Sequence, residues 1–221
     1  ASGEYSTAVG PFAAATGYSA TAIGDTANAT GDDSIAAGHY SVAQGTSAAA
    51  FGDNSQALGD NSFAAGSNST ATYTNDIALG NGARTGGTGY GYGNYGNNIE
   101  IGTNAYAGSY NGGNVASGEN ANATGKYGVA LGRNTTASGK YSTAIGYRAL
   151  ASGQFSTALG NLTIATGLYS TAVGSHVYSS GAYATAIGSW SYATGYQGTA
   201  VGAGSHSDGD LSAAFGAGAH A

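Results

Sequence analysis

The sequence predicts an all-β fold in which short strands form a solenoid of 14-residue coils. Three observations predict it. Glycine recurs at every seventh position along most of the 221 residues, and the residue before it alternates between an apolar residue and Ser or Thr. The true period is therefore fourteen, in two similar halves. The segments between the glycines are short, rich in β-branched residues and bounded by turn formers, which is typical of strands and too short for helices.

The glycine ladder defines how the chain is organised. Regular coils are predicted in 1–80 and in 118–221, with an irregular inserted region over about 81–117. Because the same repeat resumes after the interruption, we predict one domain over 1–221.

The interruption can be divided by counting residues. Gly80 and Gly118 are 38 residues apart, ten more than two coils. If Ile101–Gly102 ends a strand, eight extra residues precede Gly102 and two follow it. Such insertions in repeat proteins form surface loops.

The strand Thr143–Ile145 represents the alternation within a coil. Side chains alternate between the two faces of a strand, so Thr143 and Ile145 share one face and Ala144 the other. We expect the face with the larger apolar residue to point inward, and the small Ala face to pack closely against other chains. Gly146 then turns the chain, because glycine accepts a positive φ.

A coil of this length buries little on its own. The interior of a 14-residue coil admits about one apolar residue per strand, and stacking helps only along the axis. The thinness predicts an obligate oligomer and leaves the number of chains open.

Composition excludes several classes of function. The chain has 11 acidic and 5 basic residues, a net charge of −6 and no Cys. Disulfides and thiolate metal sites are impossible, few groups remain for acid–base catalysis, and the acidic balance argues against nucleic acid. No leader or long apolar run is present, so we expect no direct membrane contact. The chain starts and stops in mid-pattern and is expected to be part of a longer protein.

The repeat motifs resemble a known family. They are STAIG (142–146), STALG (156–160) and STAVG (6–10 and 170–174), with alternating ATG and ASG triplets, at 14-residue spacing. The sequence is similar to the YadA-like head of trimeric autotransporter adhesins over essentially the whole chain except roughly 81–117.

The resemblance implies a left-handed parallel β-roll assembled as a homotrimer. It implies a bacterial surface protein, anchored in the outer membrane through regions outside this segment, with a role in virulence. Its expected function is attachment to host extracellular matrix, host cell receptors or other cells, through proteins or glycans. About 15 coils at about 4.8 Å each would give a rigid rod on the order of 70 Å, with multivalent contacts. The alternative within this class is a purely structural spacer or self-association module.

The candidate ligand-binding residues begin with the inserted region. Tyr90, Tyr92 and Tyr95 lie in its Gly-rich segment, and Arg84 precedes them. Aromatic side chains on a flexible loop are typical of binding sites, although these rings could equally pack on their own roll.

Two stacked lysines are a further candidate site. Lys126 and Lys140 are fourteen residues apart and could meet acidic partners, or could be solvated turn residues. Tyr147 and Arg148 are the other plausible contact residues nearby. Trp190, the only Trp, occupies a turn position where it could be an exposed contact or a cover for the side of the roll.

An aromatic ladder runs beside these lysines. It consists of Tyr127, Tyr141, Phe155, Tyr169 and Tyr183. Repetition at every coil favours a structural role, in which stacked rings stabilise neighbouring coils, over a contact strip.

No metal-binding, cofactor or catalytic site is predicted. His39, His176, His206 and His220 share no metal-ligand spacing, and Asp32–Asp33 faces no partner across a cleft, so we predict no metal, no cofactor and no enzyme. A polysaccharide-cleaving β-helix would need longer coils.

An ice-binding β-solenoid is a second class of function. Threonines form a ladder at 14-residue spacing: Thr143, Thr157, Thr171, Thr185 and Thr199. Because these threonines share a face with Ile145, we expect them to point inward, which argues against this class.

Overall fold

The computed structural model of the chain describes residues 1–86, 96–108 and 112–221. Contacts divide it into two compact units, 1–114 and 115–221, and each is described by itself. The described residues form strands and turns without a helix, which confirms the all-β prediction. Among the residues that the structure describes, no helix could cross a membrane.

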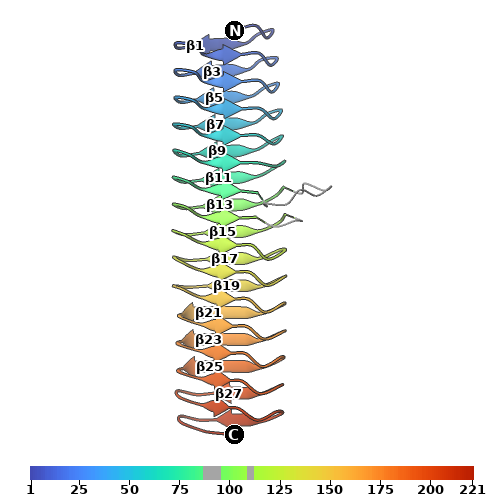
Figure 1. Cartoon of the computed structure of the whole chain (residues 1–221), viewed down its shortest axis with the longest axis vertical. Coiled ribbons are helices and arrows are strands. Elements are labelled where there is room, and N and C mark those ends of the chain that lie inside the picture. The colour runs from blue at the N-terminus through green and yellow to red at the C-terminus, as the bar shows by residue number, and fades with distance from the viewer. Residues whose placement is uncertain (87–95, 109–111) are drawn as a thin grey trace. The chain divides into compact units, whose positions relative to one another are not determined.

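Unit 1 contains two parallel sheets, one of odd-numbered and one of even-numbered strands (Figure 1). The odd-numbered strands are β1 (Thr7–Val9), β3 (Thr21–Ile23), β5 (Ile35–Ala37), β7 (Ala49–Phe51), β9 (Phe63–Ala65), β11 (Ile77–Leu79) and β13 (Ile99–Ile101). The even-numbered strands are β2 (Ala14–Ala15), β4 (Asn28–Ala29), β6 (Val42–Ala43), β8 (Gln56–Ala57), β10 (Thr70–Ala71), β12 (Arg84–Thr85) and β14 (Tyr106–Ala107).

Unit 2 repeats the same arrangement. Its odd-numbered strands are β15 (Val115–Ser117), β17 (Val129–Leu131), β19 (Thr143–Ile145), β21 (Thr157–Asn161), β23 (Thr171–Ser175), β25 (Thr185–Ser189), β27 (Thr199–Val201) and β29 (Ala213–Phe215). Its even-numbered strands are β16 (Asn122–Ala123), β18 (Thr136–Ala137), β20 (Leu150–Ala151), β22 (Ile164–Ala165), β24 (Tyr178–Ser179), β26 (Tyr192–Ala193) and β28 (His206–Ser207).

Each strand pairs with the equivalent strand one coil later. Thr143 pairs with Thr157 in a parallel register, and the next two positions of β19 and β21 follow in step. The Thr143 N–H donates to the Ser156 carbonyl oxygen at 2.9 Å. The 14-residue coil of a parallel β-solenoid, predicted from the glycine spacing, is confirmed.

The extra residues of unit 1 lie where the count placed them. Ile77 pairs with Ile99, a step of 22 residues rather than 14, which puts eight extra residues between β12 and β13. The Ile99 N–H donates to the Asn114 carbonyl, two residues further along than the regular step from Thr143 to Ser156. Strands β12, β13 and β14 therefore continue the roll inside the region predicted to be irregular.

The interior of the roll is built from alanine. Ala144 and Ala151 are fully buried between the two sheets, as are their equivalents in nearly every coil. Thr143 and Ile145 lie on the outer face of β19, where they are half-buried. The prediction that they face inward, with Ala outside, is wrong. The sheets enclose a layer of methyl groups, and branched side chains are accommodated only outside it.

The regularly spaced glycines are required for two different reasons. Gly146 has a φ of 128°, which side chains disfavour, whereas Gly139 has no positive φ. A Cβ on Gly139 would lie 2.0 Å from the carbonyl oxygen of Gly153, one coil later. Gly139, Gly146 and Gly153 all lie at bends that open turns, but the predicted reason, a positive φ, is right only for alternate glycines. The left-handed turn residues with φ near 55° are mostly not glycine, for example Tyr141 (58°) and Arg148 (53°).

Candidate functional site

The inserted tyrosines Tyr90, Tyr92 and Tyr95 lie outside the described residues, and their role as contacts stays a prediction. Arg84 is described: it is exposed on β12, in register with Thr70 and Tyr106.

The two lysines contact the aromatic ladder. The Nζ of Lys126 lies 5.1 Å from the ring centroid of Tyr127, and that of Lys140 lies 5.2 Å from the ring of Tyr141. These distances are within the range of a cation–π interaction. Their role in ligand binding stays a prediction.

The aromatic ladder is continuous in unit 2. Rings one coil apart have centroids 4.6 to 5.1 Å apart and stack nearly parallel, with an interplanar angle of only 4° between Tyr141 and Phe155. Each residue of the aromatic ladder has a positive φ, in the left-handed region, which is uncommon for bulky residues. The geometry fits the interpretation that stacking between coils stabilises the turns.

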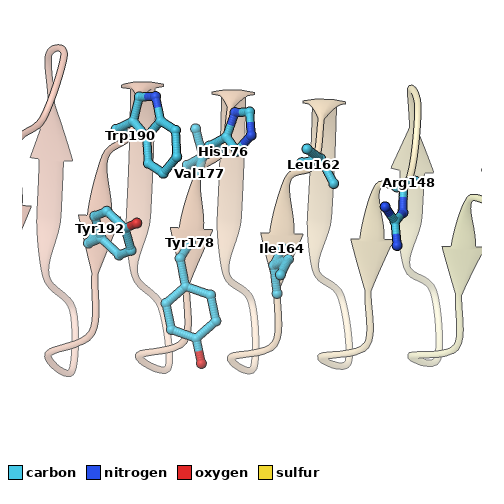
Figure 2. A pocket seen from close by; sticks show the side chains of 8 residues that line it. All are labelled: Arg148, Leu162, Ile164, His176, Val177, Tyr178, Trp190 and Tyr192. Carbon is cyan, nitrogen blue, oxygen red and sulfur yellow. The ribbon is translucent and has the colours of Figure 1, made fainter.

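A groove that the sequence analysis missed lies on the side of unit 2, with a volume of about 300 Å³. Figure 2 shows its side chains in two rows: turn residues Arg148, Leu162, His176 and Trp190, and strand residues Ile164, Tyr178 and Tyr192. Members of each row are fourteen residues apart, and this spacing is the signal that could have revealed the groove.

Aromatic rings dominate the groove. The rings of His176 and Trp190 stack with centroids 4.3 Å apart and 9° from parallel. The rings of Tyr178 and Tyr192 lie 6.4 Å apart and are tilted by 50°. Val177, beneath them, is the largest fully buried apolar side chain among the described residues.

An apolar stripe covers the outer face of the odd-numbered strands in unit 2. It consists of the residues before alternate glycines: Leu131, Ile145, Leu159, Val173, Ile187, Val201 and Phe215. Leu159 is 42% exposed and Ile187 is 39% exposed. A contiguous exposed apolar patch of this kind marks an interaction surface.

Unit 1 contains a buried carboxyl group that breaks the repeat. Glu100 is fully buried on β13, where Ala78 occupies the equivalent position on β11. Its Oε1 accepts a hydrogen bond from the Ala107 N–H, and its Oε2 has no partner among the described residues. Burial, and to a lesser extent the nearby Asp76 carboxylate, raises the pKa of Glu100 to about 9, against smaller opposing effects of the Ala107 hydrogen bond and of Arg84.

The neighbouring carboxyl group of Asp76 is better satisfied. Its Oδ1 accepts hydrogen bonds from the backbone N–H and side-chain amide of Asn98, at 3.0 and 3.1 Å, and its Oδ2 accepts one from the Tyr73 N–H at 2.9 Å. Burial still raises the pKa of Asp76. Burial, and secondarily the charge of Glu100, also raises the pKa of the Tyr106 hydroxyl.

Within the described ranges, no three His, Cys, Asp or Glu residues gather in a way that could hold a metal ion. The carboxyl groups of Glu100 and Asp76 are buried in the roll of unit 1, whereas the groove and the apolar stripe of unit 2 are accessible.

The family comparison decides what kind of repeat this is. The model described as the YadA head domain repeat matches in ten segments, which together cover 172 of the 221 residues: 1–83, 115–176 and 179–205. The chain belongs to the YadA head family. This membership indicates an adhesin-type module of trimeric autotransporters, a class that is surface-exposed at the outer membrane and typically not enzymatic. No curated protein matches the sequence significantly.

The matches also show what is particular to this YadA-like head. Residues 84–114, which include Glu100, lie outside every match. So do Val177 and Tyr178, which fall between two matched segments and line the groove. Two of the eight groove residues and the buried carboxyl group therefore lie outside the matched repeats.

Proposed function

We propose that this YadA-like head is a surface-exposed adhesin that attaches a bacterium to host extracellular matrix, host cell receptors or other cells. It acts as a homotrimer of left-handed rolls, in which 1–221 forms a single head. Three copies of each contact raise the overall affinity even where one contact is weak. Anchoring to the outer membrane and a contribution to virulence are part of this proposal.

The apolar stripe of unit 2 is the observation that supports a trimer. A single chain leaves Leu159 and Ile187 roughly two-fifths exposed on a flat sheet face. Burying apolar surface stabilises association by about 25 cal/mol per Å² before the costs of binding. Three chains that meet with this face toward a common axis would cover the stripe.

Charging the stripe is expected to separate the chains. The double substitution Leu159→Asp and Ile187→Asp places six carboxylates in one trimer interface, where each would lack a partner. Light scattering after size exclusion should give three times 21.3 kDa for the parent chain and a smaller mass for the variant. Leu150→Asp, on the outer face of the even-numbered strands, is the matched control and should remain trimeric.

A monomeric parent chain would refute the trimer. A folded, stable monomer of 21.3 kDa at micromolar concentration leaves the stripe without its expected cover.

Adhesion itself is tested by binding to immobilised collagen, fibronectin, laminin and glycans, and to whole cells. We expect saturable binding to at least one class. No binding to any of them would favour the structural spacer or self-association module.

An observation also keeps the ice-binding alternative open. The threonine ladder pairs in register on the outer face of the odd-numbered strands, against the expectation that it faces inward. In the proposed trimer this face is covered, so the oligomeric state separates the two functions. Thermal hysteresis of a monomeric parent chain would support ice binding.

A further inference from the structure

The groove of unit 2 ends in an open aromatic surface. Trp190 is 54% exposed, and one face of its ring is covered by His176 at 4.3 Å. One coil later, fourteen residues on, the chain has Gly204 instead of a side chain, and no atom lies within 4 Å of where its Cβ would be. The stack of turn side chains therefore stops at Trp190, and its outer face is free to take a ligand.

The backbone beneath the groove is already fully engaged between coils. The Ile164 N–H donates to the Val177 carbonyl at 2.8 Å, and the Tyr178 N–H donates to the Ser191 carbonyl at 3.0 Å. The turn residues pair in the same way, with the Trp190 N–H donating to Ser175 at 2.9 Å. A peptide could not add to this surface as a strand, so a ligand must be recognised by side chains alone.

The available side-chain groups are hydroxyls and one guanidinium. Among the described residues, the hydroxyl groups of Tyr178 and Tyr192 have no hydrogen-bond partner and Arg148 has no ion pair. Arg148 lies at the opposite end of the groove from Trp190 (Figure 2). The two ends are three coils apart, or about 14 Å at about 4.8 Å per coil.

The charge around the groove favours an anion. Between Glu119 and Asp208 the sequence contains Lys126, Arg133, Lys140 and Arg148 and no Asp or Glu, although the whole chain has a net charge of −6. Arg148 is the only one of the four cations that lines the groove. A single planar guanidinium matches one carboxylate in bidentate geometry, whereas a densely sulfated chain requires a cluster of cations.

We propose that this groove binds a short saccharide that carries a carboxylate. The apolar face of one sugar ring packs on the open face of Trp190, the hydroxyls of Tyr178 and Tyr192 bond to sugar hydroxyls, and Arg148 pairs with the carboxylate. Three or four sugar units span the distance. This inference rests on the proposed function as a surface-exposed head, and it specifies the ligand class and the residues that bind it.

The single tryptophan gives a direct readout of the site. The chain contains one Trp and 17 Tyr, so fluorescence excited at wavelengths where tyrosine does not absorb reports on Trp190 and hence on the groove. The probe is a tetrasaccharide of alternating glucuronic acid and N-acetylglucosamine, titrated into the intact head and followed by fluorescence and by calorimetry. Chitotetraose is the neutral probe, a carrageenan tetrasaccharide, which carries sulfates and no carboxylate, is the sulfated one, and a poly-glutamate peptide is the acidic polypeptide.

Two variants test the two ends of the groove. Arg148→Ala is expected to weaken binding of the carboxylated probe by about tenfold or more. Gly204→His places an imidazole over the open face of Trp190, and His accepts the left-handed backbone as His176 does, so it should block binding without changing a groove residue. Arg133→Ala, an exposed residue paired with Glu119 at 3.1 Å, is the matched control and should bind normally.

The outcomes separate this inference from the proposed function. A fluorescence change with the carboxylated probe that is lost in both variants supports the groove. Equal binding of the neutral, sulfated or peptide probe overturns the assignment of a carboxylated saccharide, and no change with any probe at millimolar concentration overturns the site. Adhesion to cells or matrix without saccharide binding leaves the proposed function and refutes this inference. Saccharide binding without adhesion supports this inference and refutes the proposed function.

Discussion

Replacing Glu100 with glutamine is expected to flatten the pH dependence of stability and to stabilise the head at neutral and alkaline pH. The physical reason is the burial of a carboxyl group at a position that holds alanine one coil earlier. Its Oε2 has no hydrogen-bond partner among the described residues, so ionisation would leave a buried charge largely unsatisfied. Glutamine keeps the shape of the side chain and cannot ionise.

The direction of the pH dependence of stability follows from the direction of the pKa shift of Glu100. The pKa of Glu100 is raised from 4.5 to about 9, so between these values the folded chain holds a proton that the unfolded chain has lost. Stability is therefore greatest below about pH 4.5 for this group and falls as pH rises to about 9. At 1.36 kcal/mol per pH unit, the loss between pH 4.5 and 7 is on the order of 3 kcal/mol. The raised pKa of Asp76 acts with the same sign at lower pH.

Urea unfolding of the parent and of Glu100→Gln, measured from pH 4.5 to 8.5 at fixed protein concentration, checks this result. The free energy of unfolding of the parent should fall with pH and that of the variant should change much less. Glu119→Gln, an exposed carboxylate paired with Arg133, is the control and should behave as the parent does. Parallel pH curves for parent and Glu100→Gln would contradict the assignment.

Replacing Gly153 with alanine is expected to destabilise unit 2 by about 3 kcal/mol or more. Gly153 needs no positive φ, yet its Cβ would lie 2.0 Å from the carbonyl oxygen and 2.7 Å from the carbonyl carbon of Gly167. Both atoms belong to the backbone of the next coil, which is fixed by hydrogen bonds on either side and cannot yield as a side-chain end can. The two coils must separate to admit one methyl group.

Ser152 provides a control in the same coil, because it directly precedes Gly153 and its side chain is exposed. Thermal unfolding followed by circular dichroism should show a large fall in melting temperature for Gly153→Ala and little change for Ser152→Ala. Equal effects of the two substitutions would contradict the coil-to-coil contact as the cause.

The period and pairing of the coils could be predicted from sequence because glycine spacing records a backbone constraint. The same count located the eight extra residues before Ile99, since in-register pairing leaves surplus residues no place in the sheets. Which face points inward could not be predicted from alternation alone. Alternation groups Thr143 with Ile145, but the separation of the sheets decides that only Ala144 fits between them.

The candidate site was predictable to a lesser degree. Arg148 and Trp190 are each predicted as possible contacts, and their separation by three coil periods can be read from the sequence, but the spacing alone does not show that they line one groove. The open face of Trp190 depends on the lack of a side chain at Gly204. In the sequence, Gly204 cannot be distinguished from the other turn glycines. Glu100 was overlooked for a related reason: a single acidic residue in an irregular region gives no sign that it is buried.

The in-register pairing of coils also bears on how such a gene can change. Duplication or loss of 42 base pairs, one coil, leaves every remaining strand with an equivalent partner, as Thr143 has in Thr157. A change in length that is not a whole number of coils leaves surplus residues outside the regular pairing, as the 22-residue step from Ile77 to Ile99 does for eight residues. The fold thus permits replication slippage in whole coils, and lineages of this head can alter their reach in steps of about 4.8 Å without any new packing solution.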